Sequence, residues 1–519
     1  MRKKLPTGIQ SFEKIRSDNY YYVDKTYFIK KLLEEGNYYF LSRPRRFGKS
    51  LFLDTLKQAF LGKKELFQGL YLEKNWDWSQ KYPVIHLDFG GRTLEKDEGN
   101  YLRSWIIDQL KRNQVLLDVE CHEDKDYAKC LEELIFRAYK KYGCKVVVLI
   151  DEYDKPILDR IEDRDKAKEI REILKNLYSV LKPLDYYLRF VFITGVTKFS
   201  KVSLFSGINQ LNDITLDRAY STICGYTEEE LREVFAEELG GVDLEALRCW
   251  YNGYSFCGEP VYNPFDILLY LQKREYRPFW FETGTPSFLL KVLGEKKFYF
   301  PELEEMKLTE DLLSSFEIEN IEPETLLFQT GYLTIKECES TLSGVFYTLS
   351  YPNKEVRVAL NQTLVRYLTQ STTPLKVMRD VGLALASGDV EKFGNILKSV
   401  FASIPYEWHR KNEIARYEGY YASVIYSFLL GTGLDVIAED WLNKGRIDLT
   451  IKVGDKFYLL EFKVLEREDE VPKALQALKE RSYVEKYRAK AREIYLIGID
   501  FSQLRGEVVS FAWEKVAGT

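Results

Sequence analysis

The sequence predicts an α/β protein with a parallel sheet in its first half and a second, smaller α/β domain near its C-terminus. Between residues 38 and 194, apolar runs such as Lys145–Asp151 (KVVVLID) alternate with helical segments, a pattern typical of strands buried on both faces of a parallel sheet. Near the C-terminus, alternating apolar residues flank Gly454 and Asp455, a pair that favours a two-residue β-turn. Helices are expected to cover both sheets.

The first half of the chain repeats the strand and helix patterns in regular order, as expected for a nucleotide-type α/β domain. The expected strand 188–194 ends in a polar threonine, and the expected strand before it, 145–151, leads into acidic residues. The expected strands are 38–42, 84–89, 145–151 and 188–194, and the expected helices are 101–113, 127–142 and 163–181.

From about residue 226 the pattern becomes helical. Thr227 precedes an acidic first turn, which predicts a capped helix. Two strand-like runs, 326–337 and 345–352, precede a helix at 354–369, and together they favour a helical lid with a hairpin like that of a winged helix. With Ser371–Lys376 as a linker, the predicted domains are 1–225 (P-loop domain), 226–370 (lid) and 375–519.

Composition and charge exclude several classes of protein. Of the 519 residues, 45% are hydrophobic and 30% charged, as in globular proteins with two or three cores. The net charge of −5 excludes a uniformly basic surface, so any nucleic-acid site must be a local patch. The sequence contains no run of 18 apolar residues that would predict a membrane span, and its N-terminus lacks the apolar segment of a secretory signal. We therefore expect a cytoplasmic protein without membrane contacts.

Cysteine and histidine give little indication of metal or redox chemistry. The seven cysteines lack CxxC spacing and are typical of reduced cysteines in a cytoplasmic protein. The three histidines form no HxxxH pattern, so no zinc site is expected. A Ser-His-Asp arrangement around His86 is an alternative, but a single histidine within a strand is more commonly structural.

The segment Tyr38–Phe60 predicts a phosphate-binding loop. A short strand leads into a basic loop, and Gly48, Lys49 and Ser50 open a helix. In such an arrangement backbone N–H groups and the positive helix end face phosphate oxygens, the lysine reaches the β- and γ-phosphates, and the serine binds Mg²⁺. The alternative is that GKS occurs by chance in a basic loop.

The loop departs from the full P-loop pattern at its first glycine. Arg43 occupies that position, and Arg45 and Arg46 follow. We therefore expect arginine side chains to supply part of the phosphate binding that a P-loop otherwise makes through backbone N–H groups.

Asp151 and Glu152 are the expected partners of this loop. They end a buried apolar strand, where P-loop enzymes place an aspartate that supports Mg²⁺ and a glutamate that activates water. Thr194, at the end of another strand, is a weaker candidate for sensing the γ-phosphate. A buried strand that merely exits into an acidic loop, and a threonine that merely begins a turn, are the alternatives.

The C-terminal hairpin carries a second group of charged residues. If Gly454 and Asp455 form the turn, Leu449 and Ile451 share an apolar face with Ile447, whereas Asp448 faces Glu461 on the other side, next to Lys463. Opposed carboxylates destabilise a strand pair by roughly 0.2–1 kcal/mol unless a cation lies between them. Carboxylates, the carbonyl of Phe462 and water make a site for Mg²⁺ or Mn²⁺. An exposed strand face with mixed charges is the alternative.

Two neighbouring segments extend this group. Glu418, at the start of a predicted helix, is a further carboxylate that could complete the metal shell, although a first-turn glutamate also favours any helix. Residues 471–493 hold seven lysines and arginines against three glutamates, with Tyr483 and Tyr487 between them. This basic stretch is a candidate for binding a phosphate backbone, and a solvated basic face is the alternative.

The hairpin, with a preceding helix glutamate and a following helix, resembles the PD-(D/E)XK nuclease superfamily and its restriction-endonuclease-like fold. The whole chain resembles prokaryotic proteins in which an AAA-ATPase-like domain is fused to such a nuclease domain. This resemblance rests on YYVDKTYFIKKLL, LSRPRRFGKSLFLDTL, VVVLIDEYDKPI, FITGVTKFSKVSLFSGINQLNDIT, YNGYSF, VYNPFDIL, WFETGTPSFLL and the hairpin, which together cover nearly the whole chain.

The resemblance implies ATP binding at Lys49 and Ser50, with Asp151 and Glu152 as the Walker B pair. Arg46, in the basic loop, is a further candidate for binding the nucleotide. In that family the SRPRRFGKS form of the loop is usual. The resemblance also implies a nuclease metal site formed by three carboxylates and a lysine; these are Glu418, Asp448, Glu461 and Lys463. The glutamine that the family often carries on the next helix is displaced by one position at Gln476.

The leading hypothesis is a cytoplasmic nuclease that uses Mg²⁺ and is gated by its ATPase domain. DNA is the expected partner rather than RNA, although the residues do not separate the two, and homo-oligomers are left open. The alternative from another class is a nucleotide-dependent switch or DNA-binding regulator with a non-cleaving nuclease fold. A protein-remodelling AAA machine is a third hypothesis, for which the sequence shows no pore-loop signal.

Overall fold

The structure, a computed structural model, divides into two units: residues 1–289 with 306–353, and residues 290–305 with 354–519. It describes residues 3–91, 98–122, 125–199, 204–205, 208, 210–283, 289–290, 292–293, 299–314, 317–369, 374–404, 418–442, 445–467, 470–480, 484–488 and 490–517. The three-domain division at residues 225 and 370 stays a prediction. Of the predicted linker 371–376, residues 371–373 lie outside the described residues and residues 374–376 belong to a helix, 374–387.

A five-stranded parallel sheet, in the order β2-β3-β4-β1-β5, forms the centre of the first unit. All residues of β1 and β3 are buried, which confirms the predicted parallel sheet. Because the strands are parallel, the loop after β1 and the acidic residues at the end of β3 lie at the same edge of the sheet, with β4 between the two strands. The strands are β1 Tyr38–Ser42, β2 Val84–Asp88, β3 Val146–Asp151, β4 Leu188–Gly195 and β5 Asn212–Asp213.

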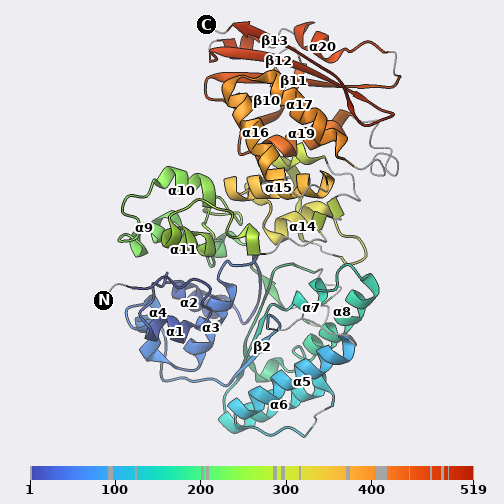
Figure 1. The fold of residues 1–519 in the computed structure, drawn as a ribbon. Helices are drawn as coiled ribbons and strands as arrows, with labels where there is room; N and C mark the ends of the chain where they lie inside the picture. The colour runs from blue at the N-terminus through green and yellow to red at the C-terminus, as the bar shows by residue number, and fades with distance from the viewer. Residues whose placement is uncertain are drawn as a thin grey trace. The chain divides into compact units, whose positions relative to one another are not determined.

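Helices lie on both sides of this sheet (Figure 1). One group follows the N-terminus and the phosphate loop, and the other lies between β2 and β4. Asp126 and Asp163 cap the N-termini of α6 and α8 through their carboxylates, which fixes where these helices begin. The helices are α1 Phe12–Ser17, α2 Thr26–Glu35, α3 Lys49–Phe60, α4 Tyr71–Asn75, α5 Glu98–Leu116, α6 Tyr127–Tyr142, α7 Lys155–Leu158 and α8 Arg164–Ser179.

The remainder of the first unit contains short helices and a three-stranded antiparallel sheet, in the order β6-β8-β7. Thr227 and Glu230 form the capping box that the sequence predicts for α9. The strand expected from residue 326 was wrong in its first part, because Pro323 opens a helix and Gly331 ends it with a left-handed φ of +92°. The elements are α9 Glu228–Val234, α10 Leu244–Tyr251, α11 Pro264–Lys273, β6 Met306–Thr309, α13 Glu310–Ser314, α14 Pro323–Thr330, β7 Thr334–Thr341 and β8 Gly344–Ser350.

The second unit is built on the sheet β13-β12-β11-β10-β9, in which only β11 and β12 are parallel. One face packs against the helices that precede the hairpin: the hydroxyl of Tyr458 donates to the Leu385 carbonyl, and Tyr421 stacks on Phe501. The other face packs against α20. The elements are α15 Lys354–Thr369, α16 Pro374–Ser387, α17 Val390–Ala402, α19 Glu418–Gly431, β9 Asp435–Leu442, β10 Gly445–Val453, β11 Lys456–Leu465, α20 Ala474–Glu480, α21 Glu485–Arg488, β12 Glu493–Ser502 and β13 Val508–Ala517.

None of the helices in the described part of the chain combines the length and the apolar character that crossing a bilayer requires.

Candidate active sites in the two units

The phosphate loop has the strand–loop–helix form that the sequence predicts. Gly48 adopts a left-handed φ of +96° and caps α3, a conformation that a residue with a Cβ would adopt only with strain. Lys49 is buried, and its Nζ donates to the carbonyl oxygens of Arg43 (2.9 Å) and Pro44 (3.0 Å). Burial lowers the pKa of Lys49, and the carboxylates of Glu152 and Asp151 oppose that shift. The phosphate loop therefore holds the Lys49 ammonium group through its own backbone carbonyls.

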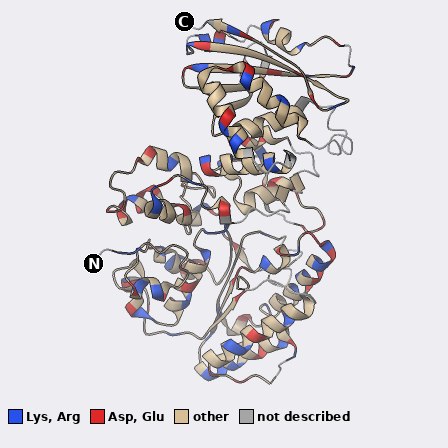
Figure 2. Ribbon diagram, viewed as in Figure 1, with Lys and Arg blue, Asp and Glu red and all other residues tan. Residues whose placement is uncertain are grey.

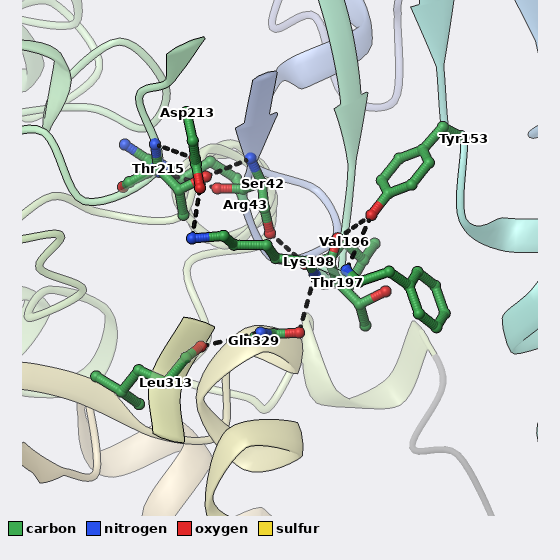
Figure 3. A network of polar contacts seen from close by, with 11 residues as sticks. Ser42, Arg43, Tyr153, Val196, Thr197, Lys198, Asp213, Thr215, Leu313 and Gln329 are labelled. Atoms are coloured by element: carbon green, nitrogen blue, oxygen red, sulfur yellow. Dashed lines mark hydrogen bonds and ion pairs between the residues drawn. The ribbon is translucent and has the colours of Figure 1, made fainter. Parts of the chain in front are cut away.

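The expectation that Arg43 binds phosphate is wrong, because its side chain is fully buried on the far side of the loop. The guanidinium donates to the carbonyl oxygens of Ser42, Thr215 and Tyr220, and it stacks on the ring of Phe256 at 3.8 Å. Burial lowers the pKa of Arg43 to about 10. Arg43 thus supports the loop through contacts that a glycine could not make, and Figure 3 shows it beside Ser42 and Thr215.

Aromatic residues from the segments YNGYSF and WFET complete the support of the loop. Phe47 packs edge-on against Tyr254, with ring centres 4.8 Å apart. The indole N–H of Trp280 donates to the Arg45 carbonyl at 3.1 Å. These contacts leave the side chains of Arg45 and Arg46 exposed at the mouth of a cavity, so Arg46 remains a candidate ligand of a phosphate.

Asp151 and Glu152 lie next to the loop, as predicted. Asp151 is 4% exposed, and burial raises its pKa to about 6, although a hydrogen bond with the Ser50 side chain lowers it. Burial also raises the pKa of Glu152, whose backbone is left-handed with a φ of +47°. Asp88, which pairs with Asp151 across β2 and β3, is a third carboxylate at this edge that sequence reasoning missed. Its position at a strand end was the available signal.

Asp154 and Thr194 organise the loop that follows β4. The Asp154 carboxylate is buried and accepts hydrogen bonds from the N–H groups of Val196 and Thr197 and from the Thr197 hydroxyl. Sequence reasoning missed this role, although DEYD shows a second aspartate. Thr194 is fully buried and lies beside Leu41 of β1. Among the described residues, Val196 rather than Thr194 lines the cavity, and γ-phosphate sensing by Thr194 stays a prediction.

These residues surround a cavity of about 490 Å³, a volume that suits a small-molecule ligand. Its polar part is formed by the loop and the acidic edge, including Lys49, Ser50 and Glu152. Its apolar part is formed by residues far apart in the sequence: Pro6, Ile9, Leu51, Tyr226, Phe265 and Leu268. An anionic group with an apolar ring system would match both parts.

A polar network connects the loop after β4 to α14 (Figure 3). Lys198 forms a largely buried ion pair with Asp213 at 2.5 Å, and its backbone N–H donates to the side chain of Gln329 at 2.9 Å. The amide of Gln329 in turn donates to the Leu313 carbonyl. Pro44 lies against the end of α14, because a Cβ at Gly331 would be 2.7 Å from Pro44. The edge of the cavity is thereby joined to the α13–α14 segment.

In the second unit, the hairpin β10–β11 has the predicted register. Leu449 pairs with Leu460 and Ile451 with Tyr458. Gly454 has a φ of +60° and Asp455 a negative φ, as in the predicted II′ type of turn. The expected position of Ile447 was wrong: it packs in the cluster that contains Phe457, Leu459 and Leu478, on the face that α20 covers. The recorded pairing of β10 with β11 ends at Leu449.

Asp448, Glu461 and Lys463 meet around the backbone of Phe462. Instead of facing Glu461 across the strands, Asp448 inserts its carboxylate and accepts the Phe462 N–H at 2.8 Å. Lys463 donates to the Phe462 carbonyl at 2.9 Å, and its Nζ lies 3.5 Å from a carboxylate oxygen of Glu461. Glu461 is 1% exposed. The structure therefore brings the three predicted hairpin residues together.

Asp500 and Gly498 on β12 bring α20 to the same end of the sheet. Asp500 pairs with Lys463, is buried, and accepts the N–H groups of Lys473 and Ala474. Burial raises the pKa of Asp500, whereas these two hydrogen bonds lower it. Gly498 pairs with Glu461, and a Cβ there would collide with the backbone of Leu475. Sequence reasoning missed both residues, since their roles depend on the parallel pairing of β11 and β12.

Comparison with known proteins gives a family match in each half of the chain. A family model described as predicted AAA-ATPase matches residues 6–205, and one described as PD-(D/E)XK nuclease superfamily matches residues 416–511. The chain is 49% identical over 520 residues to an uncharacterized protein in the vnfD 5′ region of Azotobacter chroococcum mcd 1, with 99% of each chain covered. The chain belongs to this family of AAA-ATPase-like proteins with a PD-(D/E)XK domain. No solved structure matches it.

In the PD-(D/E)XK domain, the described residues of the predicted basic stretch include two helices, α20 and α21. Several of its cations have acidic partners, including Lys479 with Glu514 and Arg488 with Glu485. Tyr487 is 4% exposed and packs against Phe457, so its ring is not available for base stacking. Tyr483 lies outside the described residues. Figure 2 shows acidic and basic residues interspersed along the ribbon.

The donor atoms of both domains fit a hard divalent cation. In the AAA-ATPase-like domain these are the Ser50 hydroxyl and the Asp151 carboxylate; in the nuclease domain they are the carboxylates of Asp448 and Glu461. Mg²⁺ commonly binds one or two carboxylates and retains several waters. Within the described residues, no three His, Cys, Asp or Glu side chains form a metal cluster. The side chain of Glu418 lies outside the described residues, and Gln476 is exposed and donates to Glu480.

Proposed function

We propose that the chain binds and hydrolyses ATP and that its C-terminal domain is a Mg²⁺-dependent nuclease that cleaves phosphodiester bonds, with DNA as the preferred substrate. The observation that supports the nuclease most is the meeting of Asp448, Glu461 and Lys463 around the Phe462 backbone. The carboxylates of Asp448 and Glu461 would be the oxygen ligands of a cation, and the ammonium group of Lys463 lies beside them.

Each of these residues has a separate role in the proposed reaction. Asp448 and Glu461 would hold the cation, which supplies a Lewis acid and an activated water when it is bound. Lys463 has 26% of its side chain exposed, which allows its ammonium group to stabilise negative charge that develops on the phosphate. Asp500 positions α20 beside them and contacts the N-terminal backbone of that helix.

In the first unit, the cavity next to the phosphate loop supports ATP as the ligand. Lys49 and Arg46 would contact phosphates, Ser50 and Asp151 would hold Mg²⁺, and Glu152 would orient or deprotonate the attacking water. The apolar part of the cavity, including Tyr226 and Phe265, is suited to a nucleoside base.

The test is a cleavage assay with the full chain. Supercoiled plasmid, single-stranded DNA and RNA are incubated with Mg²⁺ or Mn²⁺, with and without ATP. We expect cleavage of DNA by the native protein and its loss in Glu461→Gln, with Glu507→Gln as the matched control, because Glu507 is exposed between β12 and β13. Equal cleavage by Glu461→Gln and the native protein would contradict the catalytic assignment.

Gating of the nuclease by the ATPase domain is the further part of this proposal. The Lys198–Gln329 contact joins the edge of the nucleotide cavity to α14, from which the chain continues through β7 and β8 into the second unit. We expect Gln329→Ala to retain ATP binding and nuclease activity but to lose the dependence of cleavage on ATP. If cleavage by this variant depends on ATP as it does in the native protein, the Lys198–Gln329 contact does not transmit the gating.

A non-cleaving regulator is the second candidate function. It is favoured by the internal contacts of the hairpin site, since Asp448 and Lys463 both bind the backbone of Phe462. Nucleotide-dependent DNA binding without cleavage under Mg²⁺ and Mn²⁺ would support this candidate over the nuclease.

A further inference from the structure

Two cysteines far apart in the sequence have adjacent sulfur atoms in the first unit. The Sγ of Cys338 lies 2.7 Å from the Sγ of Cys257, and both are free thiols. Cys338 is exposed on β7, and Cys257 is partly buried in the turn that the Tyr254–Val261 bridge closes. A disulfide bond of about 2.05 Å would require the sulfur atoms to approach by only about 0.7 Å.

Backbone contacts hold the two thiols in place. The N–H of Ser255 donates to the Thr334 hydroxyl at 2.7 Å, and that hydroxyl contacts the Ser255 carbonyl at 3.2 Å. These bonds fasten the turn to the start of β7, four residues before Cys338. Cys257 adopts a φ of +63°, a left-handed conformation that is uncommon outside glycine. The proximity of the thiols therefore comes from ordered backbone on both sides.

We propose that Cys257 and Cys338 are an oxidation site that forms a reversible disulfide when the protein meets hydrogen peroxide. The exposed Cys338 thiolate attacks one peroxide oxygen, which gives a sulfenic acid and releases one water. The Cys257 sulfur then displaces the sulfenic oxygen, which leaves as a second water when the S–S bond forms. Two thiols lose two hydrogens in total, and the peroxide is reduced to two waters. A dithiol reductant reverses the reaction by exchange.

The order of the two steps follows from the surroundings of each sulfur. Burial, and the hydrogen bond from Cys338, raise the pKa of the Cys257 thiol, so it is the poorer first nucleophile. The disulfide would also have a structural consequence, because Phe256, the residue before Cys257, stacks on Arg43 behind the phosphate loop. Oxidation would attach that support covalently to β7. This inference does not depend on the proposed enzymatic function.

The test is peptide mapping of the full chain after treatment with hydrogen peroxide. Cys249, which is exposed, shares a tryptic peptide with Cys257 (residues 249–273), so the experiment uses the Cys249→Ser background. After free thiols are blocked with N-ethylmaleimide, we expect residues 249–273 and 337–354 as one linked species that separates on reduction. Recovery of the two peptides separately alkylated, overoxidised, or linked to other cysteines would overturn the proposal.

Single variants give an independent readout. Cys338→Ser should form no linked species with Cys257, whereas Cys257→Ser should leave Cys338 as a sulfenic acid that dimedone traps. Dimedone labelling of Cys257 in the Cys338→Ser variant at the same rate would contradict the assignment of Cys338 as the first nucleophile. The mapping of the Cys249→Ser protein decides the proposal even where a variant at Cys257 does not fold.

Discussion

Replacing Asp151 by asparagine should stabilise the first unit while it removes Mg²⁺-dependent nucleotide binding. Burial raises the pKa of this carboxyl from 3.8 to about 6, so the folded state holds its proton more tightly than the unfolded state does. The stability that protonation contributes is therefore lost as pH rises from about 4 to about 6, and the loss is complete above that range. The difference corresponds to about 3 kcal/mol at pH 8 and about half of that at pH 5.

Asparagine removes this loss because its side chain does not ionise. Its amide oxygen can still accept the Glu152 N–H, which the Asp151 carboxylate accepts at 3.0 Å. The unit contains about 340 residues, for which about 3 kcal/mol corresponds to a rise in melting temperature of about 4 °C. The rise should be largest at pH 8.

The assay is thermal melting of both proteins at pH 5 and pH 8, with and without Mg²⁺ and ADP. The ligand should raise the melting temperature of the native protein but not that of Asp151→Asn. Asp118→Asn is the control, since its side chain is 96% exposed and should change neither value. If Asp151→Asn melts no higher than the native protein at pH 8, the raised pKa does not describe this carboxyl and the reasoning fails.

Three further predictions concern the phosphate loop, the contact between β12 and α20, and the cysteine pair. Arg43→Gly should lower the melting temperature because it leaves three buried carbonyls without their donor. Lys49→Ala, which leaves two loop carbonyls without their donor, should lose at least tenfold in ATP affinity by calorimetry, more than Arg43→Gly loses. Native-like melting of Arg43→Gly, or a larger loss of ATP affinity in Arg43→Gly than in Lys49→Ala, would contradict this. Gly498→Ala should lower the free energy of unfolding by roughly 2 kcal/mol, measured by urea titration, because the added Cβ would collide with the α20 backbone. The control Gly382→Ala, whose Cβ would meet no atom within 4 Å, should not lower that free energy. Oxidation of the Cys257–Cys338 pair should raise the melting temperature of the first unit by about 6 °C, and dithiothreitol should reverse the rise. The melting temperature of Cys338→Ser should not change on oxidation.

The local sequence pattern was sufficient to predict the bounds of an element where at least one face of that element is buried along its whole length. The strand 38–42 and the helices 127–142 and 354–369 have the bounds that the sequence predicts. The hairpin register was predictable for the same reason, because a shift by one residue would have turned Leu449 and Ile451 to the other face.

The parts that could not be predicted depend on contacts distant in sequence. Arg43 becomes a buried structural residue only because Phe256, Thr215 and Tyr220 surround it. Tertiary packing around Arg43 therefore maintains the form of this loop, in which arginine replaces glycine. The sequence of the loop alone suggests instead that the arginine binds phosphate. Asp88 and Asp500 likewise enter the sites through pairing between strands that are far apart along the chain.

Both sites hold their lysine on a backbone carbonyl of the same site. Lys49 donates to Arg43 and Pro44 in the phosphate loop, and Lys463 donates to Phe462 in the hairpin. An ammonium group has three N–H donors, so a phosphate can bind beside these carbonyls; a carbonyl that the phosphate displaces needs another partner. Displacement of that kind would favour a second arrangement of the loop, and a ligand shifts the protein only by its differential affinity for the two arrangements. In the first unit, the carbonyls that Lys49 would release lie directly before Arg45, whose carbonyl accepts the Trp280 N–H, so nucleotide binding would change the contacts of the loop with that segment first.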